Sequence, residues 1–452
     1  MKNMTARLFG TNGIRGVVNQ EMNASFALDV GSAIGTYMGG KVAVATDCRT
    51  SADMIKSAVA AGLMASGVSV LDLGMLPTPA LQYYVKNSGV KGGVMITASH
   101  NPPEFNGIKC IDYDGTEMPR EKEERIEGIF FNKSSVHKNW KSVGSIAPVE
   151  GVARAYSAAI RQRVNVEAIS AAKLNVVLDC ANGAATATSP DLLADLGVRV
   201  ISLNSNPQGT FPGHPSEPTA DNLKDLMATV KATGADLGIA HDGDADRTIF
   251  VDDKGNFVFG DRSLAIVARH IVKQNGGGLV VTPVSSSSCV EDVVKAEGGE
   301  VVYTRVGSPV VARKMIEVGA IFGGEENGGL IFPEHQYCRD GGMTAAKMLE
   351  IVALEGSMSK LLSKIPEYYL DKRKMECPED RKEEVLALVV EAFANEKVDT
   401  TDGVKVYFTE GWTLIRPSGT EPIFRMFSEA KSVEAAKKCG DRCENALREM
   451  LK

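Results

Sequence analysis

The feature that most constrains this chain is a pattern of strands and helices that occurs three times. In each copy a short apolar strand runs into a polar loop, a helical stretch and a second strand follow, and a third strand ends in a charged or glycine-rich loop. The first strands of the three copies are predicted at Val42–Ala45, Val176–Leu178 and Leu279–Thr282. Strands that alternate with helices at this spacing predict largely parallel sheets. The chain is therefore predicted to contain three related α/β units.

The third strands of the three copies end in the loops that carry most of the polar residues. The first runs into Ser99, the second into His241 and Asp242, and the third into the loop 323–329, which contains Glu325 and Asn327. Ligands of such sheets gather beyond the carboxyl ends of the strands. The three loops are therefore expected to lie on one side of a shared site.

The rest of the chain predicts a fourth, smaller domain. After Pro366 comes a charged run, Asp371–Glu384, which is typical of a solvated linker or helix face. Strands are predicted at Val404–Phe408, Trp412–Ile415 and Ile423–Phe427, followed by an amphipathic helix. The predicted fold is thus three α/β domains with mixed, largely parallel sheets and a C-terminal α+β domain around a central cleft, with limits at 1–150, 151–251, 252–366 and 367–452.

Composition excludes several classes of partner. The chain has 50 Lys and Arg against 57 Asp and Glu, a net charge of −7, and no long basic block, so nucleic acid is not expected. It has no apolar run near the ~18 residues that a membrane span needs and no secretory leader pattern, which predicts a soluble cytoplasmic protein without a membrane partner. Its eight cysteines include no C-x-x-C pair, so neither a disulfide framework nor a cysteine zinc site is predicted.

Ser99 is the first candidate for chemistry. It follows a buried strand, and Pro102 and Pro103 stop that strand abruptly, so the serine is presented on a stiff turn. His100 is adjacent and Lys109 lies ten residues on, and nearby cations would stabilise negative charge arriving on the serine oxygen. The alternative is an ordinary turn built from common turn residues.

The second loop is a candidate metal site. Asp242, Asp244 and Asp246 stand at alternate positions directly after a buried strand, which allows three carboxylates to converge on one hard cation. Oxygen-only ligands suit Mg²⁺. The alternative is an acidic turn with three solvated side chains, but close carboxylates repel one another unless a cation compensates them.

Two further loops carry groups suited to a sugar phosphate. The last domain offers a phosphate site of guanidinium groups, hydroxyls and a glycine, from Arg416, Ser418, Gly419, Thr420 and Arg425. Glu325 and Asn327, enclosed by glycine pairs, are suited to hydrogen bonds with sugar hydroxyls. The alternatives are a hairpin with surface arginines and a simple hinge. Together, the serine, the carboxylates, the polyol loop and the phosphate loop predict phosphoryl transfer on a sugar phosphate.

Four motifs in this order resemble the active-site motifs of the α-D-phosphohexomutases. They are Thr97-Ala-Ser-His-Asn-Pro102, Asp242-Gly-Asp-Ala-Asp-Arg247, Gly324-Glu-Glu-Asn-Gly328 and Arg416-Pro-Ser-Gly-Thr-Glu-Pro422. The opening segment Phe9-Gly-Thr-Asn-Gly-Ile-Arg-Gly16 also resembles that family. The resemblance covers essentially the whole chain and implies four domains around a cleft, of which the fourth swings.

The resemblance also implies a role for each residue. Ser99 would be carried as phosphoserine, and Mg²⁺ would be bound by Asp242, Asp244, Asp246 and an oxygen on Ser99. Arg15, His100 and Arg247 would surround the phosphate, and Lys109 would move the proton of the substrate hydroxyl. Glu325 and Asn327 would read the sugar, and Arg416, Ser418, Gly419, Thr420 and Arg425 would hold the idle phosphate. The implied reaction interconverts hexose 6-phosphates and hexose 1-phosphates through a hexose 1,6-bisphosphate that turns round in the cleft.

One position departs from the family. Many relatives have histidine or aspartate after the glycine of Arg305-Val-Gly307, whereas this chain has Ser308, so Ser308 is left out of the catalytic set.

Glucosamine phosphate is the expected substrate, from the opening segment, the Arg416–Pro422 motif and the negative charge of Glu325 and Glu326. Mannose or glucose phosphate is the alternative. A sugar phosphatase and a non-catalytic sensor are more remote alternatives, and the sequence leaves the oligomeric state open.

Overall fold

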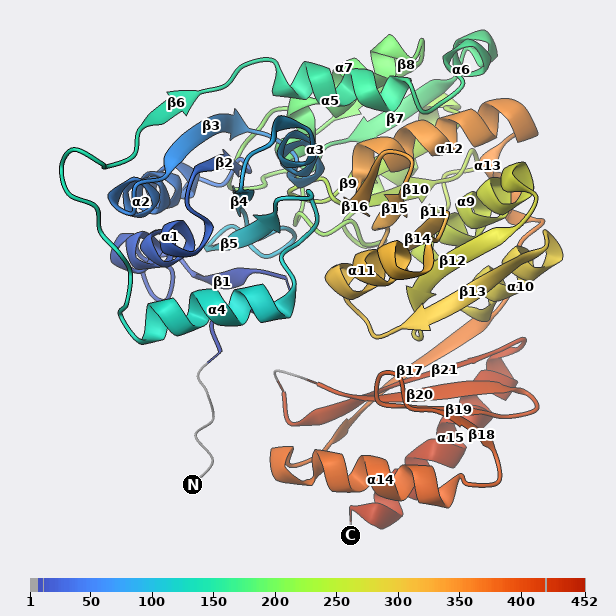
Figure 1. Ribbon diagram of the computed structural model, residues 1–452. Coiled ribbons are helices and arrows are strands. Elements are labelled where there is room, and N and C mark those ends of the chain that lie inside the picture. Colours follow the sequence, from blue (N-terminus) through green and yellow to red (C-terminus); the bar gives the residue numbers. More distant parts are fainter. Residues whose placement is uncertain (1–6, 11, 419–420, 452) are drawn as a thin grey trace.

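The computed structural model describes residues 7–10, 12–418 and 421–451 as four sheets with their covering helices. Each sheet is built from one consecutive part of the chain (Figure 1). The first unit, in blue, lies beside the second and third, in green and yellow, and the red C-terminal unit lies below the third. The predicted succession of three α/β units and a smaller fourth is confirmed.

The first sheet has the order β1-β5-β4-β2-β3-β6. Its strands are β1 (Ile14–Val17), β2 (Lys41–Thr46), β3 (Ser69–Met75), β4 (Gly92–Ile96), β5 (Phe105–Asp112) and β6 (Ile146–Pro148), and its helices are α1 (Ala24–Met38), α2 (Ala52–Ala65), α3 (Thr78–Ser88) and α4 (Arg120–Phe131). The central strands pair in parallel, while β5 is antiparallel to both of its neighbours. This strand returns the chain past Ser99 and carries Lys109 back toward the same edge.

The second sheet has the order β11-β10-β9-β7-β8. Its strands are β7 (Asn175–Asp179), β8 (Arg199–Leu203), β9 (Leu237–His241), β10 (Thr248–Val251) and β11 (Phe257–Val258), with α5 (Val152–Arg161), α6 (Val166–Ala172), η1 (Ala184–Ala187), α7 (Ser189–Asp195) and α8 (Lys224–Thr233). The aspartate loop is the connection between β9 and β10, which pair antiparallel with His241 opposite Thr248. The loop is therefore fixed at both ends by one strand pair.

The third sheet has the order β13-β12-β14-β15-β16. Its strands are β12 (Gly278–Pro283), β13 (Gly299–Thr304), β14 (Phe322–Gly324), β15 (Leu330–Phe332) and β16 (Gln336–Arg339), with α9 (Gly260–Asn275), α10 (Ser288–Ala296), α11 (Ser308–Val318), α12 (Gly341–Glu355) and α13 (Met358–Leu362). The loop with Glu325 and Asn327 connects β14 to the antiparallel β15. It repeats the arrangement of the aspartate loop.

The fourth sheet is antiparallel throughout, in the order β17-β21-β20-β19-β18. Its strands are β17 (Tyr369–Glu376), β18 (Lys397–Asp399), β19 (Val404–Tyr407), β20 (Gly411–Pro417) and β21 (Ile423–Ala430), with η2 (Glu379–Arg381), α14 (Lys382–Ala392) and α15 (Val433–Met450). The Arg416 loop joins β20 to β21. Cys439 and Cys443, one turn apart on α15, are buried in the core of this domain.

The charged run Asp371–Glu384 corrects one prediction. Its first part, Asp371 to Glu376, is not a linker or helix face but belongs to the edge strand β17, which pairs with β21 over eight positions, from Tyr369 to Glu376. Charged side chains are tolerated on an edge strand because one flank faces solvent. Arg373 is held there by Asp371 and by Glu444 of α15, at 2.6 Å for each ion pair. Only the end of the run forms helix, in η2 and the start of α14.

One hydrophobic core joins the first three units, whereas the fourth has its own. Leu81 of α3, Ile239 of β9 and Leu349 of α12 belong to the same buried cluster. The fourth domain packs around residues such as Phe424 and touches the third unit through a small cluster that contains Val284, Trp412 and Leu414. The loops of the first three units are thus fixed relative to one another. In the described part of the chain, no helix is long and apolar enough to cross a membrane.

Candidate active site

The Ser99 loop and the aspartate loop lie in direct contact. A Cβ on Gly243, the residue between Asp242 and Asp244, would lie 2.5 Å from the carbonyl oxygen of Ser99, so only glycine permits this approach. From the other side, the backbone N–H of Thr78 donates to the carbonyl of Asp244 at 2.9 Å. Loops that are distant in the sequence are therefore packed backbone against backbone.

Ser99 is buried and held in an unusual backbone conformation. Its φ is +53°, in the left-handed region that non-glycine residues rarely adopt, and its side chain is almost inaccessible to solvent. Ser99 Oγ donates a hydrogen bond to Asp242 Oδ2 at 2.9 Å and lies 3.3 Å from His100 Nδ1. Strain of this kind persists only where the surroundings determine the conformation. The serine is therefore positioned toward the aspartate loop by its own backbone.

Arg49 supports the Ser99 loop and was missed in the sequence. It is buried, and its guanidinium donates to the carbonyl oxygens of Ser99 and Asn101, at 2.9 and 2.6 Å, and of Pro102 and Phe105, at 2.6 and 2.9 Å. These four bonds fix the curvature of the turn from inside. The signal was its position in the loop directly after the buried strand β2.

Asp47 completes this support. Its carboxylate pairs with Arg49 Nε at 3.1 Å and accepts a hydrogen bond from the Thr97 hydroxyl at 2.6 Å. Thr97 in turn accepts from the backbone N–H of Ser99 at 2.8 Å. A buried ion pair that is hydrogen-bonded on both sides makes the loop rigid.

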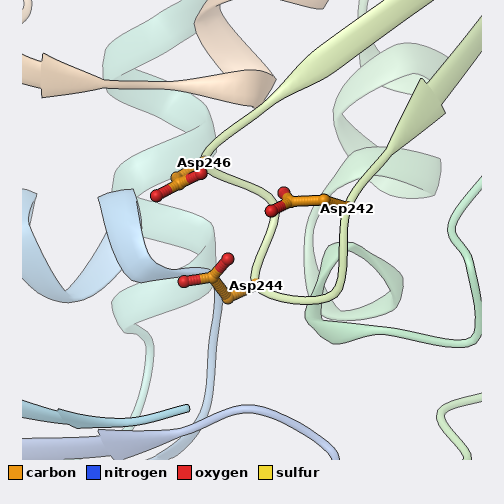
Figure 2. Close-up of side chains that lie close together, drawn as sticks. All are labelled: Asp242, Asp244 and Asp246. Atoms are coloured by element: carbon orange, nitrogen blue, oxygen red, sulfur yellow. The ribbon is translucent and has the colours of Figure 1, made fainter. Parts of the chain in front are cut away.

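The three aspartates form a compact cluster. Figure 2 shows the side chains of Asp242, Asp244 and Asp246 around a common space, and one oxygen from each lies within 4.8 Å of the others. All three are buried, and Oδ1 of Asp244 and Oδ1 of Asp246 have no hydrogen-bond partner among the described residues. Burial raises the pKa of Asp242 well above its ordinary value, and Asp244 and Asp246 raise it further. Unpartnered carboxylate oxygens at this spacing fit a divalent cation with oxygen ligands such as Mg²⁺.

Two buried cations lie against the same cluster. Lys109 Nζ donates to Asp244 Oδ2 at 2.6 Å and lies 3.5 Å from Asp246 Oδ2. Burial raises the pKa of Asp244, but Lys109 and the Thr78 hydroxyl outweigh it, so this pKa is well below its ordinary value. Arg339 of β16 binds Asp246 Oδ2 at 2.5 Å. Arg339 was not identified from the sequence, because β16 was not predicted as a strand.

Arg15, His100 and Arg247 lie on the open side of the serine. All three line a cavity of about 480 Å³ between the first, second and third units. Arg15 binds the Asn101 side chain at 2.5 Å, and Arg247 donates its backbone N–H to Asp242 Oδ1 at 3.2 Å. Burial lowers the pKa of His100 to about 3, with Arg247 and Arg15 adding to the effect. Arg15 and Arg247 thus place two guanidinium groups beside a neutral imidazole, and Arg339 lines the same cavity.

The sugar loop reaches this cavity through Glu325 and Asn327 but not through Glu326. Glu325 accepts from the Gly307 N–H at 3.0 Å and lies 3.5 Å from Arg339, so its charge is already compensated. Among the described residues that line the cavity, Glu326 is absent. Burial and Glu325 raise the pKa of Glu326. Glu325 and Asn327, and not Glu326, are therefore the side chains that this loop contributes to the cavity.

The arginines of the fourth domain are not brought into the cavity. Arg416 pairs with Asp402 at 2.8 Å, and Arg425 is half exposed and pairs with Glu421 at 3.0 Å. Ser418 is buried, and Lys382 donates to its carbonyl oxygen at 2.6 Å. Gly419 and Thr420 lie outside the described residues. Each of the two arginines is thus paired with a carboxylate of its own domain.

Asp402 links that loop to the cavity wall. Its Oδ2 forms the ion pair with Arg416 and accepts a hydrogen bond from the backbone N–H of Val306 at 3.0 Å. Val306 itself lines the cavity. The carboxylate of Asp402 thus connects the Arg416 loop of the fourth domain to the loop that contains Val306 in the third unit.

Comparison with known proteins decides the family. The α/β/α domains I, II and III of the phosphoglucomutase/phosphomannomutase family match residues 6–137, 154–255 and 259–369, and its C-terminal domain matches residues 374–446. The chain belongs to the phosphoglucomutase/phosphomannomutase family. The resemblance inferred from the four motifs and the expected class of enzyme, a phosphohexomutase, are thereby confirmed.

Relatives in this family carry different sugar names. The chain is 44% identical to a phosphoglucomutase/phosphomannomutase of Thermococcus kodakarensis, over 99% of both chains. It is 42% identical to a phosphoglucosamine/phosphogalactosamine mutase of Sulfurisphaera tokodaii, over 95% of this chain and 96% of the relative. A crystal structure of a phosphoglucomutase/phosphomannomutase family protein from Burkholderia thailandensis superposes with a TM-score of 0.88 at 29% identity, covering 98% of this chain and 97% of that one.

Proposed function

We propose that this phosphohexomutase interconverts glucosamine 6-phosphate and glucosamine 1-phosphate through a phosphoserine at Ser99. The carrying observation is the contact between the buried Ser99 and the three aspartates, beside a cavity lined by Arg15, His100 and Arg247. The cavity holds both a phosphate-binding side and a polyol-binding side. The phosphoglucosamine/phosphogalactosamine mutase among its relatives supports the amino sugar.

The four units divide the work in this proposal. Residues 1–150 carry the phosphoserine, 151–251 the metal ligands, 252–366 the sugar-reading loop and 367–452 the loop for the idle phosphate. In the last of these, Arg416, Ser418, Gly419, Thr420 and Arg425 bind the phosphate that is not reacting. Because the fourth domain has its own core, it can move as one body against the other units by changing its contacts with the third unit.

In the metal site Asp242, Asp244, Asp246 and an oxygen on Ser99 would hold Mg²⁺. When bound, Mg²⁺ supplies a positive charge that withdraws electron density from the phosphoryl oxygens. The unpartnered oxygens of Asp244 and Asp246 support this assignment. Asp242 also orients Ser99 Oγ directly, through the hydrogen bond of 2.9 Å.

The remaining groups stabilise charge and move one proton. Arg15 and Arg247 neutralise the phosphoryl group as it leaves Ser99, and neutral His100 can donate or accept a hydrogen bond beside it. The bond from phosphorus to Ser99 Oγ breaks as one to the sugar hydroxyl forms, and Lys109, in its neutral amine form, accepts the hydroxyl proton and becomes the ammonium that pairs with Asp244. The hexose 1,6-bisphosphate then turns round, and its other phosphoryl group returns to Ser99. Glu325 and Asn327 hold the sugar hydroxyls in both orientations.

The alternative substrate is glucose or mannose phosphate, which the name of the Thermococcus kodakarensis relative favours. The deciding experiment compares kcat/KM for glucosamine 6-phosphate, glucose 1-phosphate and mannose 1-phosphate with a trace of the matching bisphosphate. We expect the glucosamine value to be the highest. A glucose or mannose value that exceeds it by tenfold, about 1.4 kcal/mol, contradicts the assignment. Steady release of inorganic phosphate would instead indicate a phosphatase.

A further inference from the structure

Three polar side chains meet where the first and third units join in the cavity wall. The hydroxyl of Ser308 donates to Glu117 Oε1 at 3.0 Å, and Asn12 Nδ2 lies 3.4 Å from the same oxygen and 3.5 Å from Ser308 Oγ. Asn12 and Ser308 line the cavity, while Glu117, which is 5% exposed, lies behind them. This group is separate from the serine and the aspartates.

No cation of the described part of the chain forms an ion pair with the buried Glu117 carboxylate. Among the described residues its Oε2 has no hydrogen-bond partner and neither oxygen is in an ion pair. Arg339, the guanidinium that interacts electrostatically with Glu117, makes its ion pairs with Asp246 and Glu325 instead. A buried charge without a partner is costly, so this carboxylate is available for a positively charged group.

The hydrogen bonds determine what Asn12 and Ser308 present to the cavity. An ionised carboxylate only accepts, so Ser308 gives it its proton and Asn12 turns its amide N–H₂ toward it. What remains for a ligand is the lone pair of Ser308 Oγ and the carbonyl oxygen of Asn12. The cavity wall therefore offers two acceptor oxygens, and the negative charge of Glu117 lies behind them. A ligand that binds Asn12 and Ser308 must supply hydrogen-bond donors.

We propose that Asn12 and Ser308, held by Glu117, read the ammonium group of a 2-amino hexose phosphate. This inference rests on the proposed glucosamine phosphate substrate and names the residues that select it. An ammonium has only donors and a full charge, so it satisfies both acceptors and compensates Glu117. A hydroxyl in its place donates one proton and brings no charge. Glu117 is a positioning residue here, because it acts through the two side chains that face the cavity.

The test is the ratio of kcat/KM for glucosamine 1-phosphate to that for glucose 1-phosphate. Glu117→Gln keeps the shape of the side chain but removes its charge, and the ratio should fall by about tenfold or more, the effect of losing a charge-assisted interaction. Ser308→Ala removes one acceptor and should lower the ratio in the same way. The matched control is Glu317→Gln, an exposed glutamate on α11 paired with Lys314, which should leave the ratio unchanged.

A loss of both activities in equal proportion would show a structural role and overturn the inference, as would a ratio that falls by less than tenfold. If Glu117→Gln does not fold, Ser308→Ala decides by the same criterion. Calorimetric binding of glucosamine 1-phosphate and glucose 1-phosphate gives a second readout that does not need turnover. A wild-type enzyme that prefers glucose or mannose phosphate would instead refute the proposed substrate, which separates the two failures.

Discussion

Ser99 Oγ lies 2.9 Å from Asp242 Oδ2, in a hydrogen bond that joins the first unit to the second. Both residues are buried, and each follows the carboxyl end of a buried strand. The contact makes the serine that we propose as phosphoryl carrier and the carboxylates that we propose as metal ligands one site rather than two. Disturbing the carboxylates should therefore affect phosphoryl transfer without dismantling the fold.

Asp244→Asn should lose Mg²⁺ affinity and turnover while remaining folded. The amide is nearly the same size but removes one of the three negative charges, and Oδ1 of Asp244 has no other partner among the described residues. Titration calorimetry with Mg²⁺, activity and circular dichroism check the three parts. Chelator should abolish wild-type activity and added Mg²⁺ should restore it, so full activity in excess chelator would refute the site.

Arg49→Met should destabilise the enzyme and reduce kcat. The substitution removes the donor for four carbonyl groups of the Ser99 loop and leaves Asp47 buried without its partner. Breaking such a pair costs about 3 to 5 kcal/mol. Thermal unfolding and kcat are compared with those of Arg125→Met, a change at an exposed arginine. Equal unfolding midpoints for the two variants would contradict the role of Arg49.

Arg425→Ala should lower kcat/KM for hexose phosphates with little change in stability. Arg425 is half exposed and its only described ion pair is with Glu421, so the fold depends on it weakly. Loss of one guanidinium–phosphate interaction costs about 1.5 to 3 kcal/mol. Arg442→Ala, on α15 and paired with Glu396, serves as the control. An unchanged kcat/KM would remove Arg425 from the phosphate site.

Lys405 should make the free energy of unfolding of the wild type change with pH in the alkaline range. It is buried against Trp412 at the contact between the third and fourth units, with its Nζ 2.7 Å from the Val284 carbonyl, and burial lowers its pKa to about 8. Between pH 8 and the ordinary lysine pKa the folded protein binds fewer protons than the unfolded chain, so the contribution of Lys405 to stability increases with pH.

The comparison is with Lys405→Met, which cannot titrate. From pH 7 to pH 9.5 the free energy of unfolding of the wild type, relative to that of this variant, should rise by about 2 kcal/mol. The thermal midpoint of the wild type should rise relative to that of the variant in the same way. Groups common to both proteins cancel in the difference. A difference in stability that stays constant as the pH rises, or that changes in favour of the variant, would contradict the lowered pKa of Lys405.

The sequence predicted the site best where a strand ends in a polar loop. The strands that precede Ser99 and Asp242, and the loop with Glu325, lie where apolar runs followed by glycine, proline or aspartate placed them. The edge strand β17 was not predicted, because charged residues at successive positions, such as Lys372 and Arg373, give both faces of the segment a polar pattern. The pairing with β21 that makes this segment a strand is tertiary and has no local signature.

Long-range partners were the other limit. Arg49, Arg339 and Glu117 are far in sequence from the groups they serve, and single charged residues give no periodic signal. Ser308 was set aside because a serine cannot replace an ionisable base, and its contact with Glu117 is visible only in three dimensions. The roles of the catalytic and binding residues, the phosphoserine and the domain limits stay predictions until they are measured.

Transfer of the phosphoryl group to and from Ser99 is the most direct measurement of the central claim. Intact mass spectrometry of the wild type should show one added phosphoryl group after incubation with a hexose 1,6-bisphosphate, and excess hexose monophosphate should remove it while bisphosphate appears. Ser99→Ala should show no adduct and should lose turnover by about 10³-fold or more, whichever hexose phosphate is used. A Ser99→Ala enzyme with wild-type turnover, or an adduct that survives substrate, would contradict the account.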